Sequence, residues 1–209
     1  MAHLLITELF GKSAALPDLA IRKDLTGIGL SDSECYARVL AAKFNYTNTY
    51  FHIPPRLDIA NVEPSRAAEY DFIIASDVFE HVAPPVSRAF ANTRRLLKPG
   101  GVLVFSVPFT LAPDTVEHFP LLHEYRLEEA ADGWRLHNRD ATGRAHVHAD
   151  LVFHGGPGST LEMRLFSRAA LEREFARAGF SRVRIADDPF AEFGIVWPEP
   201  WSVPIVARA

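Results

Sequence analysis

Two stretches of the chain are almost entirely apolar, and a segment with helical periodicity separates them. Residues 72–75 (Phe-Ile-Ile-Ala) and 102–107 (Val-Leu-Val-Phe-Ser-Val) are too short for helices and lack the alternating polar positions of a half-exposed strand. We therefore expect two strands that are buried on both faces. Residues 86–97 carry apolar side chains at helical spacing, which predicts a helix between the strands.

The end of this helix and the chain direction after it follow from local sequence. Lys98-Pro99-Gly100-Gly101 ends the predicted helix, because proline cannot continue a helix and glycine suits the turn. Two apolar strands joined by a helix predict a right-handed parallel crossover. Ligands of such sheets bind beyond the carboxyl ends of the strands, where we expect Ser76-Asp77 and Pro108-Phe109.

The chain on either side of the crossover predicts further short elements. Upstream these are a helical tendency over residues 3–10, a short strand at 26–30, a helix over 33–44 capped by Ser31 or Asp32, and a strand over 45–52. Downstream, Ser167 is predicted to cap a helix that ends at Gly179. Strands are then predicted from Val183 and over residues 201–207.

Residues 125–165 have the pattern of an inserted β-hairpin region. Asp132-Gly133 and Thr142-Gly143 are turn signals. Residues 144–154 alternate, with apolar side chains on one face and His146, His148 and Asp150 on the other. These three residues are a candidate metal site, because neutral imidazole and carboxylate are good metal ligands. A solvated strand face and the wall of a pocket for a polar acceptor are the alternatives.

Composition limits the classes of protein that the chain can belong to. The 209 residues predict one domain, and the net charge of −4 argues against nucleic-acid binding through bulk charge. No apolar run is long enough for a membrane span, and the amino-terminal residues lack the features of a signal peptide. The single cysteine, Cys35, fits a reducing compartment, so a cytoplasmic protein is expected.

The crossover also carries a family resemblance. Residues 71–82 (DFIIASDVFEHV) and 95–108 (RLLKPGGVLVFSVP) resemble the fourth strand with its loop, and the fifth strand with its lead-in, of class I S-adenosylmethionine (SAM)-dependent methyltransferases. Residues 163–185 (MRLFSRAALEREFARAGFSRVRI) resemble the terminal helix and sixth strand of that family. The resemblance implies a doubly wound, Rossmann-like α/β fold over residues 1–209. Its sheet would be mostly parallel with an antiparallel carboxyl-terminal edge, and an insertion would lie at about residues 110–165.

The sequence departs from the family at the glycine-rich cofactor motif. The usual Asp/Glu-x-Gly-x-Gly-x-Gly run is missing, and residues 27–40 (GIGLSDSECYARVL) better resemble the second strand of the family. Two explanations stay open. In the first, Gly27-Ile28-Gly29 occupies the central position of a shortened fold and serves as the glycine turn, so that Asp32 reaches the ribose. Alternatively, the cofactor site is incomplete and SAM binds weakly or not at all.

The resemblance also implies roles for single residues. Asp58 with Ile59 resembles the Asp-hydrophobic pair that contacts the adenine, and Asp77 with Val78 would line the cofactor pocket. The candidate cofactor-binding residues are therefore Gly27, Gly29, Asp32, Asp58, Ile59, Asp77 and Val78. His81 is a candidate general base, because the pKa of an imidazole lies near neutrality, and a structural role in its loop is the alternative. His118, His123 and Tyr125 are further candidates on the substrate side.

The implied function is methyl transfer from SAM to a small-molecule or saccharide-like acceptor. The expected partner is a small molecule, without nucleic acid or membrane, and a homodimer is possible. A non-catalytic methyltransferase-like module that binds a partner through the inserted hairpin is the first alternative. A metal-assisted enzyme that uses His146, His148 and Asp150 is the second.

Overall fold

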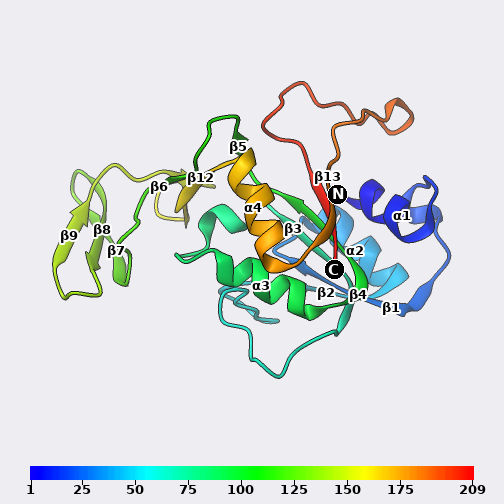
Figure 1. The fold of residues 1–209 in the computed structure, drawn as a ribbon, viewed down its shortest axis with the longest axis horizontal. Coiled ribbons are helices and arrows are strands. Elements are labelled where there is room, and N and C mark those ends of the chain that lie inside the picture. The colour runs from blue at the N-terminus through cyan, green and yellow to red at the C-terminus, as the bar shows by residue number, and fades with distance from the viewer.

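A six-stranded sheet forms the centre of the computed structural model, which describes residues 1–209 (Figure 1). The order across the sheet is β13-β14-β4-β3-β1-β2. Strands β1 to β4 run parallel, and β14 is antiparallel to both of its neighbours. The strands of this sheet are β1 (Arg22–Leu30), β2 (Phe44–Thr49), β3 (Tyr70–Ser76), β4 (Leu97–Ser106), β13 (Ser181–Ile185) and β14 (Ile205–Arg208). The predicted mostly parallel sheet with an antiparallel carboxyl-terminal edge is confirmed.

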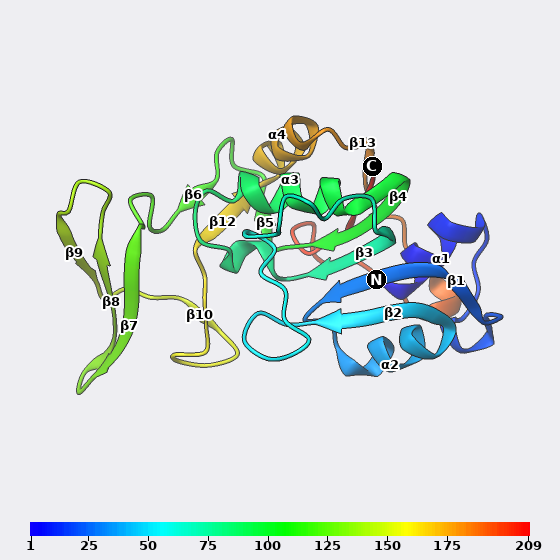
Figure 2. The same ribbon diagram turned by 90° about the horizontal axis from the view of Figure 1, so that it is seen from below.

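Helices cover both faces of the sheet. These are α1 (Ala2–Phe10), α2 (Glu34–Lys43), α3 (Ser87–Leu96) and α4 (Arg168–Ala178), with short 3₁₀ helices η1 (Leu16–Asp18), η2 (Phe79–His81) and η3 (Ala191–Phe193). Helices α1 and α2 bury apolar side chains against one face, and α3 and α4 against the other. Figure 2 shows α3 and α4 on one side of the sheet and α2 on the opposite side. None of the helices has the length and apolar character needed to cross a bilayer.

Strand β3 explains why the two apolar stretches carry no polar alternation. Its residues alternate between the two cores: Phe72 and Ile74 pack with α1 and α2, whereas Ile73 and Ala75 pack with α3 and α4. All four side chains are fully buried. A strand between two helical layers needs apolar side chains on both faces, which is the pattern that the sequence shows.

Strand β1 occupies the central position next to β3, with β2 on its other side. Gly27-Ile28-Gly29 therefore takes the central position that the first explanation expects. Both glycines lie inside β1, however, so the prediction that they form a glycine turn is wrong. Gly27 is required there for packing, because a Cβ would lie 2.2 Å from the ring of Phe72 on the neighbouring strand. The chain leaves β1 through α2 on one face and leaves β3 through α3 on the other. The sheet therefore has its topological switch point between β1 and β3.

The predicted caps of helix α4 are found in the structure, whereas the predicted N-cap of helix α2 is not. The hydroxyl of Ser167 accepts from the backbone N–H of Ala170 and caps α4, and Gly179 ends that helix in a left-handed conformation, so both predictions are confirmed. The prediction that Ser31 or Asp32 caps α2 is wrong, because Ser33 is the N-cap residue and its side chain makes no capping bond.

The last strand is shorter than the sequence indicated. It begins at Ile205 rather than at Trp201, whose side chain is half exposed. Pro204 lacks a backbone N–H and cannot contribute one to the ladder, which fits a strand that starts after it.

The insertion lies between β4 and α4 and contains several small sheets. Its strands are β5 (Phe109–Thr110), β6 (Val116–Glu117), β7 (Glu124–Ala130), β8 (Gly133–Arg139), β9 (Ala145–His148), β10 (Phe153–His154), β11 (Thr160–Leu161) and β12 (Arg164–Ser167). Strands β7, β8 and β9 form an antiparallel sheet that stands away from the central sheet (Figures 1 and 2). Both predicted turns, at Asp132-Gly133 and Thr142-Gly143, connect its strands.

The prediction of a single alternating strand over residues 144–154 is wrong. Strand β9 ends at His148, and the apolar Val147 is 61% exposed, whereas His146 and His148 are half-buried. The imidazoles turn inward because each has a partner there. His146 lies 2.7 Å from the carboxylate of Asp140, and the ring of His148 packs edge-on against Phe119.

Candidate active site

The strand ends at the switch point carry two exposed residues in a strained backbone conformation. Ser31 follows β1 with φ of 58°, and Asp77 follows β3 with φ of 54°. A positive φ is uncommon outside glycine, and such residues occur often at binding and catalytic sites. Since ligands of open α/β sheets bind at this edge and at the switch point, Ser31 and Asp77 mark the first candidate region.

Hydrogen bonds across β3 and β4 hold the Asp77 turn in place. The backbone N–H of Asp77 donates to the carbonyl of Ser106 at 2.8 Å. The hydroxyl of Ser76 lies 3.0 Å from a carboxylate oxygen of Asp77 and 2.9 Å from the hydroxyl of Ser106. Val78 packs against the core behind the turn. The carboxylate of Asp77 thus stays exposed on a fixed turn, so it can accept hydrogen bonds from a ligand.

Asp32 does not face this edge, which corrects the prediction that it reaches the ribose. Its side chain is buried and accepts hydrogen bonds from the hydroxyls of Tyr36 at 2.8 Å and Tyr46 at 2.6 Å. Burial raises the pKa of Asp32 to about 6, although the two tyrosine hydrogen bonds oppose the shift. Gly29 makes room for this pair, because a Cβ would lie 2.0 Å from the Tyr46 hydroxyl.

Asp58 and Ile59 lie in the connection between β2 and β3. The carboxylate of Asp58 accepts from the backbone N–H of Ala60 at 3.0 Å and from the side chain of Asn61 at 2.7 Å, which forms a local turn. Ile59 is buried in the core. Burial, with the charge of Asp58 as a smaller cause, raises the pKa of Tyr125.

A second candidate region lies where the insertion meets the loop after β3. Five titratable side chains gather there, and we name them the Glu–His cluster: Glu80, His81, His118, His154 and Glu162. Glu80 and His81 come from η2, and the other three come from the insertion. The cluster therefore joins the carboxyl edge of the sheet to the segment that the sequence placed on the substrate side.

Hydrogen bonds identify one donating nitrogen in each of two imidazoles of the cluster. Nδ1 of His81 lies 2.9 Å from the carbonyl oxygen of Leu161, which can only accept, so Nδ1 carries the proton and Nε2 keeps its lone pair. Nε2 of His154 lies 3.0 Å from one oxygen of Glu162, to which it donates, and Nδ1 of His154 is the nitrogen nearer Glu80. The other oxygen of Glu162 lies 2.8 Å from Nε2 of His118.

Glu80 is the most deeply buried member of the cluster. It is 1% exposed, and neither of its carboxylate oxygens has a hydrogen-bond partner. Burial raises the pKa of Glu80 to about 8, and the charges of Asp77 and Glu162 act in the same direction. Burial also lowers the pKa of His81. At neutral pH the folded protein therefore favours an uncharged imidazole beside a mostly protonated carboxyl group.

Arg164 anchors the insertion beside the cluster. Its side chain is fully buried, and Nε donates to the carboxylate of Glu117 at 2.7 Å. Nη1 donates to the carbonyl oxygens of Phe79 at 2.8 Å and Val82 at 2.6 Å. Strand β12 is thereby tied to both ends of η2, which holds Glu80 and His81 in position.

Other predicted site residues lie outside both regions. His123 is exposed just before β7, and only its backbone N–H is bonded, to Asn138. His146, His148 and Asp150 do not form a metal site, because His146 is paired with Asp140 and Asp150 lies beyond the end of β9. The residues that could hold a metal are Glu80, His81 and His154 instead.

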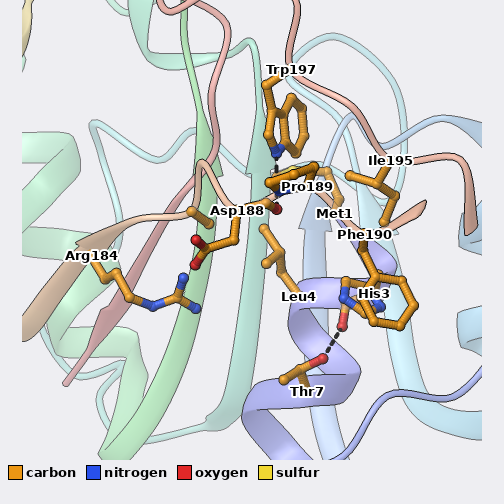
Figure 3. A pocket seen from close by; sticks show the side chains of 11 residues that line it. Met1, His3, Leu4, Thr7, Arg184, Asp188, Pro189, Phe190, Ile195 and Trp197 are labelled. Carbon is orange, nitrogen blue, oxygen red and sulfur yellow. Dashed lines mark hydrogen bonds between the residues drawn. The ribbon is translucent and has the colours of Figure 1, made fainter. Parts of the chain in front are cut away.

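A cavity of about 240 Å³ lies between α1 and the segment that follows β13 (Figure 3). His3 stacks on Phe190 with ring centroids 4.5 Å apart, and Trp197 donates from its indole nitrogen to the carbonyl of Asp188. The cavity is lined by none of the residues predicted from the sequence as site residues.

Sequence reasoning missed Glu80, His154, Glu162 and Arg164 as parts of one site. Glu80 precedes a residue that was singled out, but its burial cannot be inferred from the sequence. His154 and Glu162 come together because β10 and β11 pair around the glycine-rich turn at residues 155–158. That turn was a usable signal, since a tight hairpin places the residues on either side of it next to each other.

Comparison with known proteins identifies the family of the fold. Residues 20–185 match the family model described as a methyltransferase domain (Methyltransf_23). No curated protein matches the sequence. One similar solved structure is the 1,6-didemethyltoxoflavin-N1-methyltransferase of Burkholderia thailandensis with bound 1,6-didemethyltoxoflavin and S-adenosylhomocysteine. It is 13% identical with a TM-score of 0.51, over 99% of this chain and 76% of that chain.

A second similar structure is the CurJ carbon methyltransferase. It is 16% identical with a TM-score of 0.53, over 93% of this chain and 51% of that chain. The present chain thus spans about half the length of that protein. At these identities the two structures support the fold.

Proposed function

Since this chain belongs to the methyltransferase domain family, as the resemblance to class I SAM-dependent methyltransferases predicted, we propose that it methylates a small-molecule acceptor. The enzyme class and the methyl donor, SAM, are those expected from the sequence. The proposal concerns where the donor lies, which residues contact it and what kind of acceptor is used.

The observation that carries the proposal is the exposed turn at Asp77. It lies at the carboxyl end of β3, beside the switch point between β1 and β3, where open α/β sheets bind their ligands. The exposed carboxylate of Asp77 sits on a fixed turn and can accept hydrogen bonds. It therefore fits the polar and charged groups of SAM. Asp77 and Val78 are therefore the donor-side residues with the strongest support. Asp58 and Ile59 are placed on the adenine side by resemblance alone.

Bound SAM would supply an electrophilic methyl group, so the protein has little covalent chemistry to perform. Holding two reactants in a reactive geometry accounts for a large part of the rate in such reactions. Hydroxyl acceptors must also lose a proton, which a neutral imidazole can accept. His81 fits this role, because burial keeps it neutral and its Nε2 keeps a lone pair facing the Glu–His cluster.

The acceptor side is proposed to be the junction of the insertion with the sheet edge. His118 is held there by Glu162, and Tyr125 of β7 is the candidate phenol. A small polar or saccharide-like acceptor suits this lining of imidazole, phenol and carboxylate groups. His123 stays a weaker candidate because its ring is exposed and outside the cluster. Homodimer formation and a cytoplasmic location stay predictions.

Isothermal titration with SAM and with S-adenosylhomocysteine tests the donor site. We expect micromolar binding of both by the wild type. In Asp77→Ala the dissociation constant should rise about 10- to 100-fold, because a hydrogen bond to a charged group is worth about 1.5–3 kcal/mol. Asp24→Ala is the matched control, since Asp24 is an exposed aspartate near the amino end of β1, away from the proposed site.

Two results would contradict the proposal. The first is the absence of binding to either ligand by a well-folded wild type, which the non-catalytic alternative predicts. The second is an equal loss of affinity in Asp24→Ala and Asp77→Ala, which would show that the effect does not come from the switch point.

A further inference from the structure

The Glu–His cluster contains three potential metal ligands whose donor atoms lie within 4.8 Å of one another: Glu80, His81 and His154. Oε1 of Glu80 is 3.6 Å from Nε2 of His81 and 4.0 Å from Nδ1 of His154. Two ligand atoms bound to a tetrahedral zinc ion at about 2.1 Å lie ~3.4 Å apart. A small inward movement of these side chains would therefore complete the ligand set.

The buried carboxylate of Glu80 is an independent indication of a ligand. Only 1% of Glu80 is exposed, and neither of its carboxylate oxygens has a hydrogen-bond partner. Buried polar groups are almost always satisfied, and an exception calls for an explanation such as an ion. Oε1 points toward the two imidazoles, as its distances to them show.

In each imidazole, the nitrogen that would not bind the metal makes the hydrogen bond that is usual in metal sites. A histidine that binds a metal through one nitrogen almost always donates its other N–H to a carboxylate or a backbone carbonyl. Nδ1 of His81 donates to the carbonyl of Leu161, and Nε2 of His154 donates to Glu162. Glu162 is itself held by His118. The two remaining nitrogens, Nε2 of His81 and Nδ1 of His154, are the ones that face Glu80.

The charge balance of the region favours a dication. Glu80 and Glu117 lie near a single buried guanidinium, that of Arg164, and Glu162 adds a third carboxyl group to the region. A divalent cation bound by Glu80 would add positive charge where three carboxyl groups lie near one guanidinium. It would also provide the attraction that an isolated buried carboxylate lacks.

We propose that Glu80, His81 and His154 bind a divalent transition-metal ion through two imidazole nitrogens and one carboxylate, with a coordination position left open. Imidazole ligands suit zinc and its neighbours, whereas magnesium and calcium prefer oxygen ligands. This inference goes beyond the proposed methyl transfer and does not rest on it. When the ion is bound, Nε2 of His81 is a ligand, so His81 no longer serves as the proton acceptor.

The test is metal binding by the full chain in the absence of SAM. Protein treated with a chelator and dialysed is titrated with Zn²⁺ by calorimetry, and Co²⁺ is added separately to record the visible absorption of the bound ion. We expect one equivalent of Zn²⁺, no heat with Mg²⁺, and a loss of at least 100-fold in affinity in Glu80→Gln and in His154→Ala. Glu162→Gln removes the partner of His154 and should cost about 10- to 100-fold.

His52→Ala is the matched control, because His52 is an exposed histidine outside the cluster, and its affinity should equal that of the wild type. Far-ultraviolet circular dichroism and a urea midpoint show that each variant is folded. The proposal is overturned if the folded wild type binds no Zn²⁺, or if the Glu80→Gln/His154→Ala double variant binds as tightly as the wild type. If the protein binds Zn²⁺ but not S-adenosylhomocysteine, the metal-site proposal is supported and the proposed SAM site is contradicted.

Discussion

The hydroxyl of Tyr46 donates a 2.6 Å hydrogen bond to the carboxylate of Asp32, and both side chains are buried. Tyr46 lies within β2, opposite Gly27, and Asp32 follows β1, so the bond joins two neighbouring parallel strands. The pair occupies the space beside Gly29. A glycine in the place of the family's cofactor-binding motif thus serves the internal packing of this protein.

Gly29→Ala is expected to destabilise the protein by about 1–3 kcal/mol, the usual cost of overpacking a core. The added Cβ would lie 2.0 Å from the Tyr46 hydroxyl and 2.2 Å from an oxygen of Asp32, so the pair must separate. Urea denaturation measures the change. In a Tyr46→Phe background the substitution should cost less, because the nearest clashing atom is gone. An equal cost in both backgrounds would show that the pair is not what resists the Cβ.

Asp32 should make stability fall as the pH rises. Burial raises its pKa from 3.8 to about 6 in the folded protein. Between those values the folded state binds more protons than the unfolded state, so ionisation of Asp32 favours unfolding. The loss should begin near pH 4, reach on the order of 2–3 kcal/mol and level off above pH 6. Thermal melts of the wild type and of Asp32→Asn over this pH range isolate the contribution of Asp32. If the stabilities of the two proteins change with pH in the same way, Asp32 is not the cause of the loss.

Arg164→Ala should destabilise the protein by about 3–5 kcal/mol, the cost of breaking a buried ion pair from one side. The change removes bonds to Glu117 and to the carbonyls of Phe79 and Val82 from a fully buried site. The control is Arg168→Ala, whose exposed pair with Glu172 should contribute at most ~0.5 kcal/mol. Urea unfolding compares the two, and similar losses would contradict the anchoring role of Arg164.

Ser167→Ala should cost about 1 kcal/mol of unfolding free energy, because the N-cap bond to the N–H of Ala170 is lost. Ser167→Thr keeps the hydroxyl and adds only one methyl group to this buried site, so it should retain more of the stability. The measurement is again a urea midpoint. If Ala and Thr at this position behave alike, the hydroxyl does not act as a cap.

Features set by neighbours in sequence could be predicted. The cap at Ser167, the left-handed end at Gly179 and the two hairpin turns each depend on residues within one turn of chain. The crossover from β3 to β4 could also be predicted, because strands buried on both faces have a distinct composition.

Features set by partners from distant segments could not be predicted. Asp32 was expected to face the edge, but its partner Tyr46 comes from the next strand, and only the fold brings them together. The same holds for the Glu–His cluster, where His81 and His154 come from segments far apart in the chain, with ring centroids 4.7 Å apart. The alternation at residues 144–154 misled because Val147 faces outward, while the histidines find partners inside the insertion.

The two ends of the insertion lie side by side, because β5 and β12 pair as parallel strands with Phe109 opposite Phe166. The intervening chain therefore leaves the central fold and returns to it at one place. Segments of different length or sequence can be exchanged at such a junction without displacing β4 or α4. Recombination among relatives could thus replace the acceptor-side segment as a cassette, and new substrate ranges could arise in one step while the edge that would bind the donor stays unchanged.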